Sequence, residues 1–219
     1  MDVEHQWVHI EAERRSLAVQ LAGLSTEEWE APSLCARWRV RDVAAHVAMT
    51  PAGAPTTWQI LSGVARARGD LWRFGCDVAV AWGEERSTEE ITTVLDQQAP
   101  SRSMPVVTNA QNILLDVLVH GQDIAVPLGL DRPVPTDAGR AALHRVWSMG
   151  WPFHARRRLA GVTLVATDAD LSLGAGPEVR GRLADLLLLA TARTDAARAR
   201  LSGPGLARVV CPRTRHGAA

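Results

Sequence analysis

Apolar residues recur at helical spacing through the first two thirds of the chain. Trp7, Ile10 and Leu17 lie on one stripe of a helix expected over residues 3–21, and Gly23 follows as its end. This spacing of about 3.6 residues is the pattern of a helix with one face turned to a core.

Further helices are expected from their start and stop signals. Ser-Thr-Glu-Glu occurs at 25–28 and again at 87–90, and each copy is a capping box that begins a helix. The second of these helices is expected to reach about residue 98. The other expected helices are 40–51 ended by Pro51, 56–74, one running from a cap at Asn109 to just before Pro127, and 136–158 with a kink at Pro152.

The pattern changes after Leu159. β-branched residues alternate over 162–167, and the turn residues that follow allow 171–173 to return as a hairpin. The remaining expected elements are a short strand at 178–180, an apolar helix at 183–192 and a last strand at 206–211. The sequence therefore predicts an α+β protein, with a helical domain over 1–155 and a small α/β domain over 156–219. The run Arg156–Arg158 at the boundary is interpreted as a solvated linker.

The composition of the chain limits which classes of partner are expected. The chain has 219 residues, and its 24 basic and 24 acidic side chains cancel, so neither nucleic acid nor an anionic membrane is an expected partner. The longest apolar run, 183–192, is too short for a membrane span. The polar first residues do not resemble a signal peptide, and the three cysteines form no metal-ligand pattern. We expect a cytoplasmic protein, monomeric or homodimeric, that acts on a small molecule.

The most informative residues for chemistry are two polar side chains in an apolar stretch. Asp116 and His120 have i, i+4 spacing in the sequence Asn-Ile-Leu-Leu-Asp-Val-Leu-Val-His, so on a helix they share one face. A buried carboxylate and imidazole need a partner, and a divalent metal is one. His46, in a second amphipathic stretch, would be a third ligand. Three ligands leave a coordination position open, as in catalytic metal sites.

A structural interpretation stays open beside this one. An Asp/His pair at this spacing can simply hydrogen-bond within a helical bundle and hold two helices in register. His5 and His9 also have i, i+4 spacing, but no third ligand lies near them in the sequence, and we expect no metal there.

Three blocks of the sequence resemble one family. WEAPSLCARWRVRDVAAH at 29–46 resembles the first-histidine segment of the mycothiol-dependent maleylpyruvate isomerase family, part of the DinB-like metal-binding superfamily. DVLVHGQDIAVPLG at 116–129 is similar to the second metal-binding helix of that family, and TDADLSLGAGPEVRG at 167–181 to its small second domain. The resemblance implies a DinB-like helical bundle followed by the small α/β domain.

The resemblance also implies a metal site and a cosubstrate. The metal triad of the family corresponds here to His46, Asp116 and His120, although many relatives carry glutamate in place of Asp116. A divalent metal, with zinc favoured by nitrogen and oxygen ligands, would bind a low-molecular thiol such as mycothiol.

The expected activity follows from that thiol. Its thiolate would attack a small electrophilic, acidic substrate, either to isomerise it or to be transferred to it. Two alternatives are a metal-dependent hydrolase with water as the nucleophile, and a non-catalytic member of the fold that binds a ligand.

The family resemblance adds one candidate catalytic residue. Arg193 follows the apolar run Leu-Leu-Leu-Leu-Ala-Thr-Ala, which resembles the stretch that carries the substrate-binding arginine of the family. Relatives usually have glycine where Ala192 stands. A guanidinium is suited to hold a substrate carboxylate.

The sequence also suggests roles for four other residues. Asp123, three residues beyond His120, could orient that imidazole, or could make only a local polar contact near the helix end. Cys35 is interpreted as a small apolar side chain rather than a nucleophile, and Trp29 and Trp38 as packing residues rather than substrate platforms.

Overall fold

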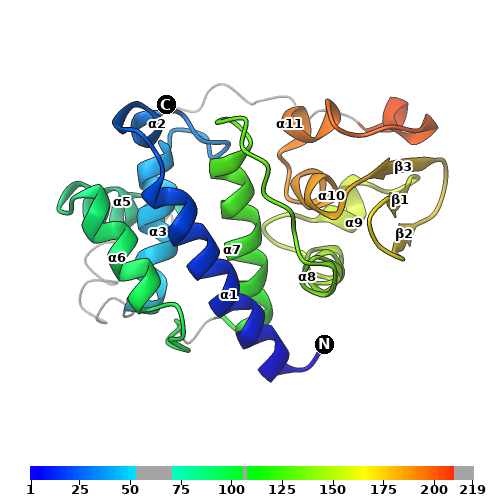
Figure 1. The fold of residues 1–219 in the computed structure, drawn as a ribbon. Helices are drawn as coiled ribbons and strands as arrows, with labels where there is room; N and C mark the ends of the chain where they lie inside the picture. The colour runs from blue at the N-terminus through cyan, green and yellow to red at the C-terminus, as the bar shows by residue number, and fades with distance from the viewer. Residues whose placement is uncertain (53–70, 106–107, 210–219) are drawn as a thin grey trace. The chain divides into compact units, whose positions relative to one another are not determined.

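The structure is a computed structural model that describes residues 1–52, 71–105 and 108–209. It divides into two compact units, Asp2–Arg132 and Pro133–Ala219, drawn in Figure 1. This boundary lies earlier than the one expected near residue 155. The reason is that the helix after Pro135, α8 (Thr136–Ser148), packs against α10 (Leu183–Ala190) and so belongs with the second unit.

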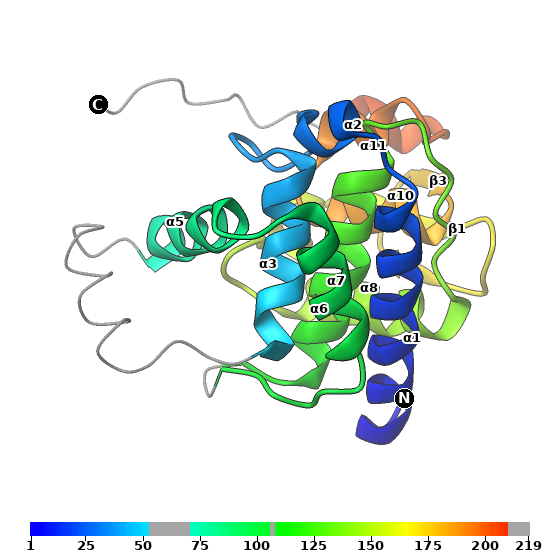
Figure 2. The same cartoon turned by 60° about the vertical axis from the view of Figure 1, so that its left-hand side comes forward.

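The first unit is helical. Its described helices are α1 (Val3–Ala22), α2 (Thr26–Glu30), α3 (Val40–Ala52), α5 (Leu71–Glu84), α6 (Thr88–Gln97) and α7 (Ala110–Ala125). Helix α7 packs against both α3 and α1, and Figure 2 shows α3 on one side of α7 and α1 on the other. None of the helices in the described ranges combines the length and the apolar character that a membrane crossing requires.

Apolar side chains from α1, α3, α6 and α7 form the core of this unit. The cluster consists of Leu17, Ala18, Leu21, Trp29, Val40, Val43, Ala44, Ala45, Val47, Ala48, Ile91, Leu95, Val117 and Ile124. In α1, α3 and α6 these residues include pairs three or four positions apart, and the two from α7 are seven apart, so they share one helix face as the periodicity predicted; Trp29 comes from α2.

The helix starts that the sequence predicted are confirmed. Ser25 and Ser87 accept hydrogen bonds from the backbone N–H groups three residues on, and the glutamate at that position returns to the serine N–H in both cases. Asn109 accepts from the N–H of Asn112 and begins α7. These side chains satisfy backbone donors that the first helical turn leaves unpaired.

A buried arginine anchors α7 to α1. The guanidinium of Arg132 donates to the Glu13 carboxylate at 2.9 Å and to the Gln20 side chain at 3.1 Å. It crosses α7 at Gly121, where an added Cβ would lie 2.5 Å from its Nε atom. Glycine directly after His120 is therefore required by this close approach.

The second unit combines helices with a small sheet. Its elements are α8, α9 (Ala155–Arg158), β1 (Thr163–Ala166), β2 (Ser172–Gly174), β3 (Glu178–Gly181), α10, α11 (Thr194–Arg198) and the 3₁₀ helix η1 (Pro204–Arg208). The strand order is β2-β1-β3, with β1 antiparallel to β2 and parallel to β3. The expected hairpin is thus confirmed, and the α+β class with it.

Several expectations about elements are corrected by the structure or lie partly outside the described residues. Residues 136–158 form two helices rather than one kinked helix, because the backbone becomes extended at Met149 and the chain turns before α9. Residues 206–208, expected to begin a strand, belong to η1, and 210–211 lie outside the described residues. Of the helix expected at 56–74, residues 56–70 also lie outside them, whereas 71–74 begin α5. Helix α3 continues past Pro51 to Ala52.

The C-terminal end of α10 is tightly capped. The N–H of Arg193 donates to the Leu188 carbonyl and that of Ala192 to the Leu189 carbonyl, which is a Schellman motif. Arg158, interpreted from the sequence as part of a solvated linker, donates to the last carbonyls of the same helix, at Leu189 and Ala190. The motif places Ala192 at φ 71°. A left-handed position favours glycine, because an L side chain is strained there.

Replacing Ala192 by glycine is expected to stabilise the protein. The Ala192→Gly change removes a Cβ from a left-handed position and should raise the free energy of unfolding by about 1 kcal/mol. Urea denaturation followed by circular dichroism measures it. The matched control is Ala199→Gly, at an exposed position with φ −65°, which should lower the free energy of unfolding. A loss of stability in both variants would contradict the argument.

Candidate metal centre

Helices α3 and α7 bring the three predicted ligands together. His46 lies on α3, Asp116 and His120 lie one turn apart on α7, and one ligand atom from each lies within 4.8 Å of the other two. The side chains of His46 and Asp116 keep 26% and 34% of their surface exposed, and that of His120 keeps 12%. The cluster is therefore open to solvent on the side of His46 and Asp116.

The spacing of these atoms fits a shared ion better than direct hydrogen bonds. Nε2 of His46 lies 3.4 Å from one oxygen of Asp116, and Nε2 of His120 lies 3.4 Å from the other oxygen. A good N–H···O hydrogen bond is shorter, about 2.7–3.2 Å. Two ligand atoms that share a tetrahedral zinc ion, each about 2.1 Å from it, lie about 3.4 Å apart. The donor set of two imidazoles and one carboxylate is also one that zinc accepts.

The charges of the three groups are strongly coupled. Burial by itself would raise the pKa of Asp116, but the positive charges of His120 and His46 outweigh it and hold the pKa well below its usual range. Burial would lower the pKa of His120, but the Asp116 carboxylate, together with hydrogen bonds to Asp123 and Cys35, raises that pKa well above its ordinary value. Without a metal, His120 therefore keeps its proton at neutral pH, and a metal ion has to displace it.

Asp123 engages the other nitrogen of His120, the contact that the sequence suggested. Its Oδ2 atom lies 2.9 Å from His120 Nδ1, and its side chain is fully buried. A carboxylate only accepts hydrogen bonds, so Nδ1 carries the proton and donates it. Nε2 is then the nitrogen that faces Asp116, and it can offer its lone pair to a metal once its own proton is displaced.

A loop closes over this end of α7. The site loop, Ser33–Arg39, folds back on itself through a hydrogen bond from the Ser33 N–H to the Trp38 carbonyl at 2.9 Å. The Leu34 N–H donates to the Asp123 carbonyl at 3.1 Å, and the Cys35 thiol donates to the Asp123 carboxylate at 3.0 Å. The loop therefore holds Asp123 by both its backbone and its side chain.

Trp38 places an aromatic ring against both imidazoles. The centroid of its ring lies 5.5 Å from that of His46 and 6.3 Å from that of His120. Trp38 also packs against the apolar core of the unit, as expected. Sequence reasoning did not find its contact with the site, or that of Cys35, because the signal was only their place in the family-like segment at 29–46.

Ion pairs at Arg39 fix the end of the site loop. Its guanidinium pairs with the buried Asp42 carboxylate at 2.9 Å, with Glu30 at 2.8 Å and with Glu84. These partners come from three helices, α2, α3 and α5. The loop that carries Cys35 and Trp38 is thus attached to the same helix as His46.

A second group of metal-binding residue types shares His120. Cys35, His120 and Asp123 also offer ligand atoms within 4.8 Å of one another. Their Sγ–Oδ2 and Nδ1–Oδ2 separations of 3.0 and 2.9 Å are hydrogen-bond lengths, shorter than the roughly 3.4–3.6 Å expected between ligands of one tetrahedral ion. We therefore interpret this group as the support of His120 rather than as a second ligand set.

Arg193, the other predicted site residue, belongs to the second unit. It precedes α11, is half-buried, and donates from Nη1 to the Thr191 carbonyl at 2.9 Å. The structure thus brings together the three predicted metal ligands, all in the first unit, and leaves the role of Arg193 a prediction.

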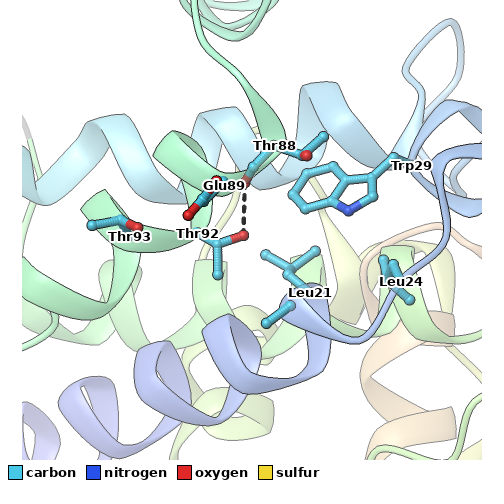
Figure 3. Close-up of a pocket in the computed structure, with 8 residues that line it drawn as sticks. Leu21, Leu24, Trp29, Thr88, Glu89, Thr92 and Thr93 are labelled. Carbon is cyan, nitrogen blue, oxygen red and sulfur yellow. Dashed lines mark hydrogen bonds between the residues drawn. The ribbon is translucent and has the colours of Figure 1, made fainter.

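A pocket in the first unit shares none of its lining residues with the candidate metal centre. It has a volume of about 310 Å³ and is shown in Figure 3 between the end of α1, Trp29 and α6. The Thr92 hydroxyl in its wall donates to the Thr88 carbonyl at 2.8 Å, within the same helix. Glu89 is the one ionisable side chain that lines it, so it lacks the convergent groups of a catalytic site.

Two solved structures share this fold. The crystal structure of a mycothiol-dependent maleylpyruvate isomerase matches with a TM-score of 0.55 and 14% sequence identity, covering 93% of each chain. A histidine-to-alanine mutant of that enzyme matches with a TM-score of 0.55 and 13% identity over the same share of each chain. Among curated protein sequences, none matches this chain.

A family model extends the likeness from fold to sequence. The model described as the mycothiol maleylpyruvate isomerase N-terminal domain matches residues 10–125, a range that includes His46, Asp116 and His120. The match covers more than half of the 219 residues. This chain belongs to the mycothiol maleylpyruvate isomerase N-terminal domain family.

Proposed function

We propose that this protein is a metal-dependent enzyme that uses a low-molecular thiol, mycothiol or a similar compound, as the nucleophile on a small, acidic, electrophilic substrate. The observation that carries the proposal is the convergence of His46, Asp116 and His120 at ligand-like separations on the solvent-open side of α3 and α7. The family and the names of the two similar structures support the thiol.

The charge of the ligand set favours a thiolate. Two neutral imidazoles and one carboxylate carry a single negative charge, which leaves a divalent cation only partly neutralised. When bound, zinc would supply a Lewis acid that stabilises the thiolate form of the cosubstrate at neutral pH. His46 and Asp116, the two more exposed ligands, border the side from which the thiol would enter.

The thiolate can act in two ways, which differ in whether the thiol is regenerated or consumed. In isomerisation it adds to one carbon of a cis double bond, the resulting single bond rotates, and elimination returns the thiolate with the trans product. In S-transfer the new carbon–sulfur bond is kept and one thiol is consumed per turnover. Thiol-dependent turnover without thiol consumption therefore identifies an isomerase.

The acidic substrate requires a cationic group. Arg193 is the candidate carried over from the family, and its guanidinium could bind a substrate carboxylate through two parallel hydrogen bonds. Its Nη1 atom donates to the backbone carbonyl of Thr191, two residues before it.

The protein is expected to bind zinc through His46, Asp116 and His120. Protein purified without a histidine tag should contain about one zinc per chain by elemental analysis, and the His46→Ala, His120→Ala double variant should contain almost none. The His5→Ala, His9→Ala variant is a matched control, since it also removes two histidines, both from α1. Asp116→Asn should also bind zinc more weakly, because the charge of the ion is less compensated. Full zinc content in the His46→Ala, His120→Ala protein would eliminate the site.

Zinc affinity should rise with pH. Since the pKa of His120 is raised in the metal-free protein, zinc displaces a proton, and zinc affinity should increase about tenfold per pH unit below that raised pKa.

The free energy of unfolding of the metal-free protein should instead fall at high pH. The His120–Asp116 ion pair stabilises it fully below the ordinary histidine pKa and is lost as pH rises through the raised one. Below the ordinary pKa of aspartate, the Asp116 contribution is lost as pH falls, because its pKa is depressed in the folded state.

Chelator competition at pH 6, 7 and 8 measures the zinc affinity, and thermal unfolding of the metal-free protein measures the stability. The His144→Gln variant, which changes an exposed histidine of the second unit, should show the wild-type pH dependence. An affinity that stays constant from pH 6 to pH 8 would show that no proton is displaced from the site.

Activity should depend on both thiol and Arg193. With zinc-loaded protein, mycothiol and maleylpyruvate, we expect turnover that leaves the thiol concentration unchanged. Arg193→Ala should lower kcat/KM about tenfold or more while zinc content stays constant, because a charge-assisted, bidentate contact is lost. Arg157→Ala, at an exposed arginine of the same unit, is the control. Turnover without thiol would instead indicate a hydrolase, and wild-type kinetics in Arg193→Ala would remove Arg193 from the site.

A further inference from the structure

We propose that Cys35 is a positioning residue of the metal centre, whose thiol holds Asp123 and, through it, the His120 imidazole. This inference rests on the proposed metal site and adds a residue to it. Cys35 is neither a metal ligand nor the nucleophile in this assignment.

The contacts of Asp123 carry the proposal. Its Oδ2 atom accepts from the Cys35 thiol at 3.0 Å and from His120 Nδ1 at 2.9 Å, so one oxygen joins the two side chains. The Cys35 sulfur also lies 3.7 Å from His120 Nδ1, which closes a triangle of the three groups. Asp123 is completely buried, so it depends on protein donors to replace water.

The thiol supplies a donor that the loop backbone does not. The Leu34 N–H reaches only the main-chain carbonyl of Asp123, and this bond fixes the backbone without restraining the carboxylate. The Cys35 thiol and the His120 ring approach the same oxygen and restrict its rotation from two directions. Loss of the thiol therefore removes one of the contacts that restrict the carboxylate, and the acceptor of the imidazole is held less firmly.

A displaced imidazole would bind metal less well. Partners of a ligand's second nitrogen orient the ring, and their removal typically lowers metal affinity by about 10–100-fold. Cys35 acts one contact further out than Asp123. The effect of removing its thiol should therefore lie between wild type and the effect of removing the Asp123 carboxylate.

The test compares variants of Cys35 in the full-length protein, first without metal. Histidine-selective ¹⁵N labelling and long-range ¹H–¹⁵N spectra report whether His120 Nδ1 is protonated and how fast that proton exchanges with water, with His120→Gln for assignment. We expect a protected Nδ1–H in wild type and Cys35→Ser, and faster exchange in Cys35→Ala. Cys76→Ala, which removes another half-buried cysteine, should match wild type.

Zinc affinity from chelator competition is the second readout. The expected order is wild type and Cys35→Ser, then Cys35→Ala, then Asp123→Asn. If Cys35→Ala does not fold, the pair Cys35→Thr and Cys35→Val replaces the first pair, since these side chains have the same shape and only threonine donates a hydrogen bond. Greater Nδ1–H protection in the threonine variant would support the proposal.

Two outcomes would separate this inference from the proposed function. Equal Nδ1–H protection and equal zinc affinity in wild type and Cys35→Ala would overturn the role of Cys35 while leaving the metal site intact. If wild type binds no zinc, the proposed function fails, and the metal-free spectra still decide whether the thiol positions His120.

Discussion

Helix α7 is buried along most of its length, and this burial constrains every polar side chain on it. An unpaired polar group in such a place costs free energy, so each of them needs a partner. Gln122 donates to the Arg132 carbonyl at 2.8 Å, and Asp123 accepts from Cys35 and His120. The Nε2 atoms of His46 and His120 each lie 3.4 Å from an oxygen of Asp116, which is longer than a good N–H···O hydrogen bond. The candidate metal centre lies where direct pairing is incomplete.

The surroundings of α7 fix its position on three sides. The Arg132 guanidinium ties it to α1 by way of Glu13, with the close approach at Gly121. Apolar contacts pack it against α3, which carries His46. The site loop covers its C-terminal half and is itself attached to α3 through the Arg39–Asp42 ion pair. Because each ligand stands on a packed helix, the ligand geometry can be held before any metal binds.

The candidate ligands, Asp123 and Cys35 have different chemical roles. His46, Asp116 and His120 offer lone pairs and one negative charge, which leaves a divalent cation able to stabilise a further anion. Asp123 selects the tautomer of His120, and Cys35 restrains Asp123. The Cys35 proton is engaged in a hydrogen bond to a buried carboxylate, which suits the thiol to a positioning role rather than to that of a nucleophile.

Local signals in the sequence were enough for most elements and for the shared helix face of two of the three candidate ligands. Capping boxes at Ser25 and Ser87, the i, i+4 spacing of Asp116 and His120, and the β-branched run at 162–167 act over a few residues, so they could be interpreted directly. The boundary after Arg132, the break after Ser148 and the 3₁₀ turn of η1 depend on packing between distant segments. The same holds for Cys35 and Trp38, which are more than 80 residues from His120 in the chain. Periodicity places a side chain on a face of its own helix, but only the tertiary structure decides which loop meets that face.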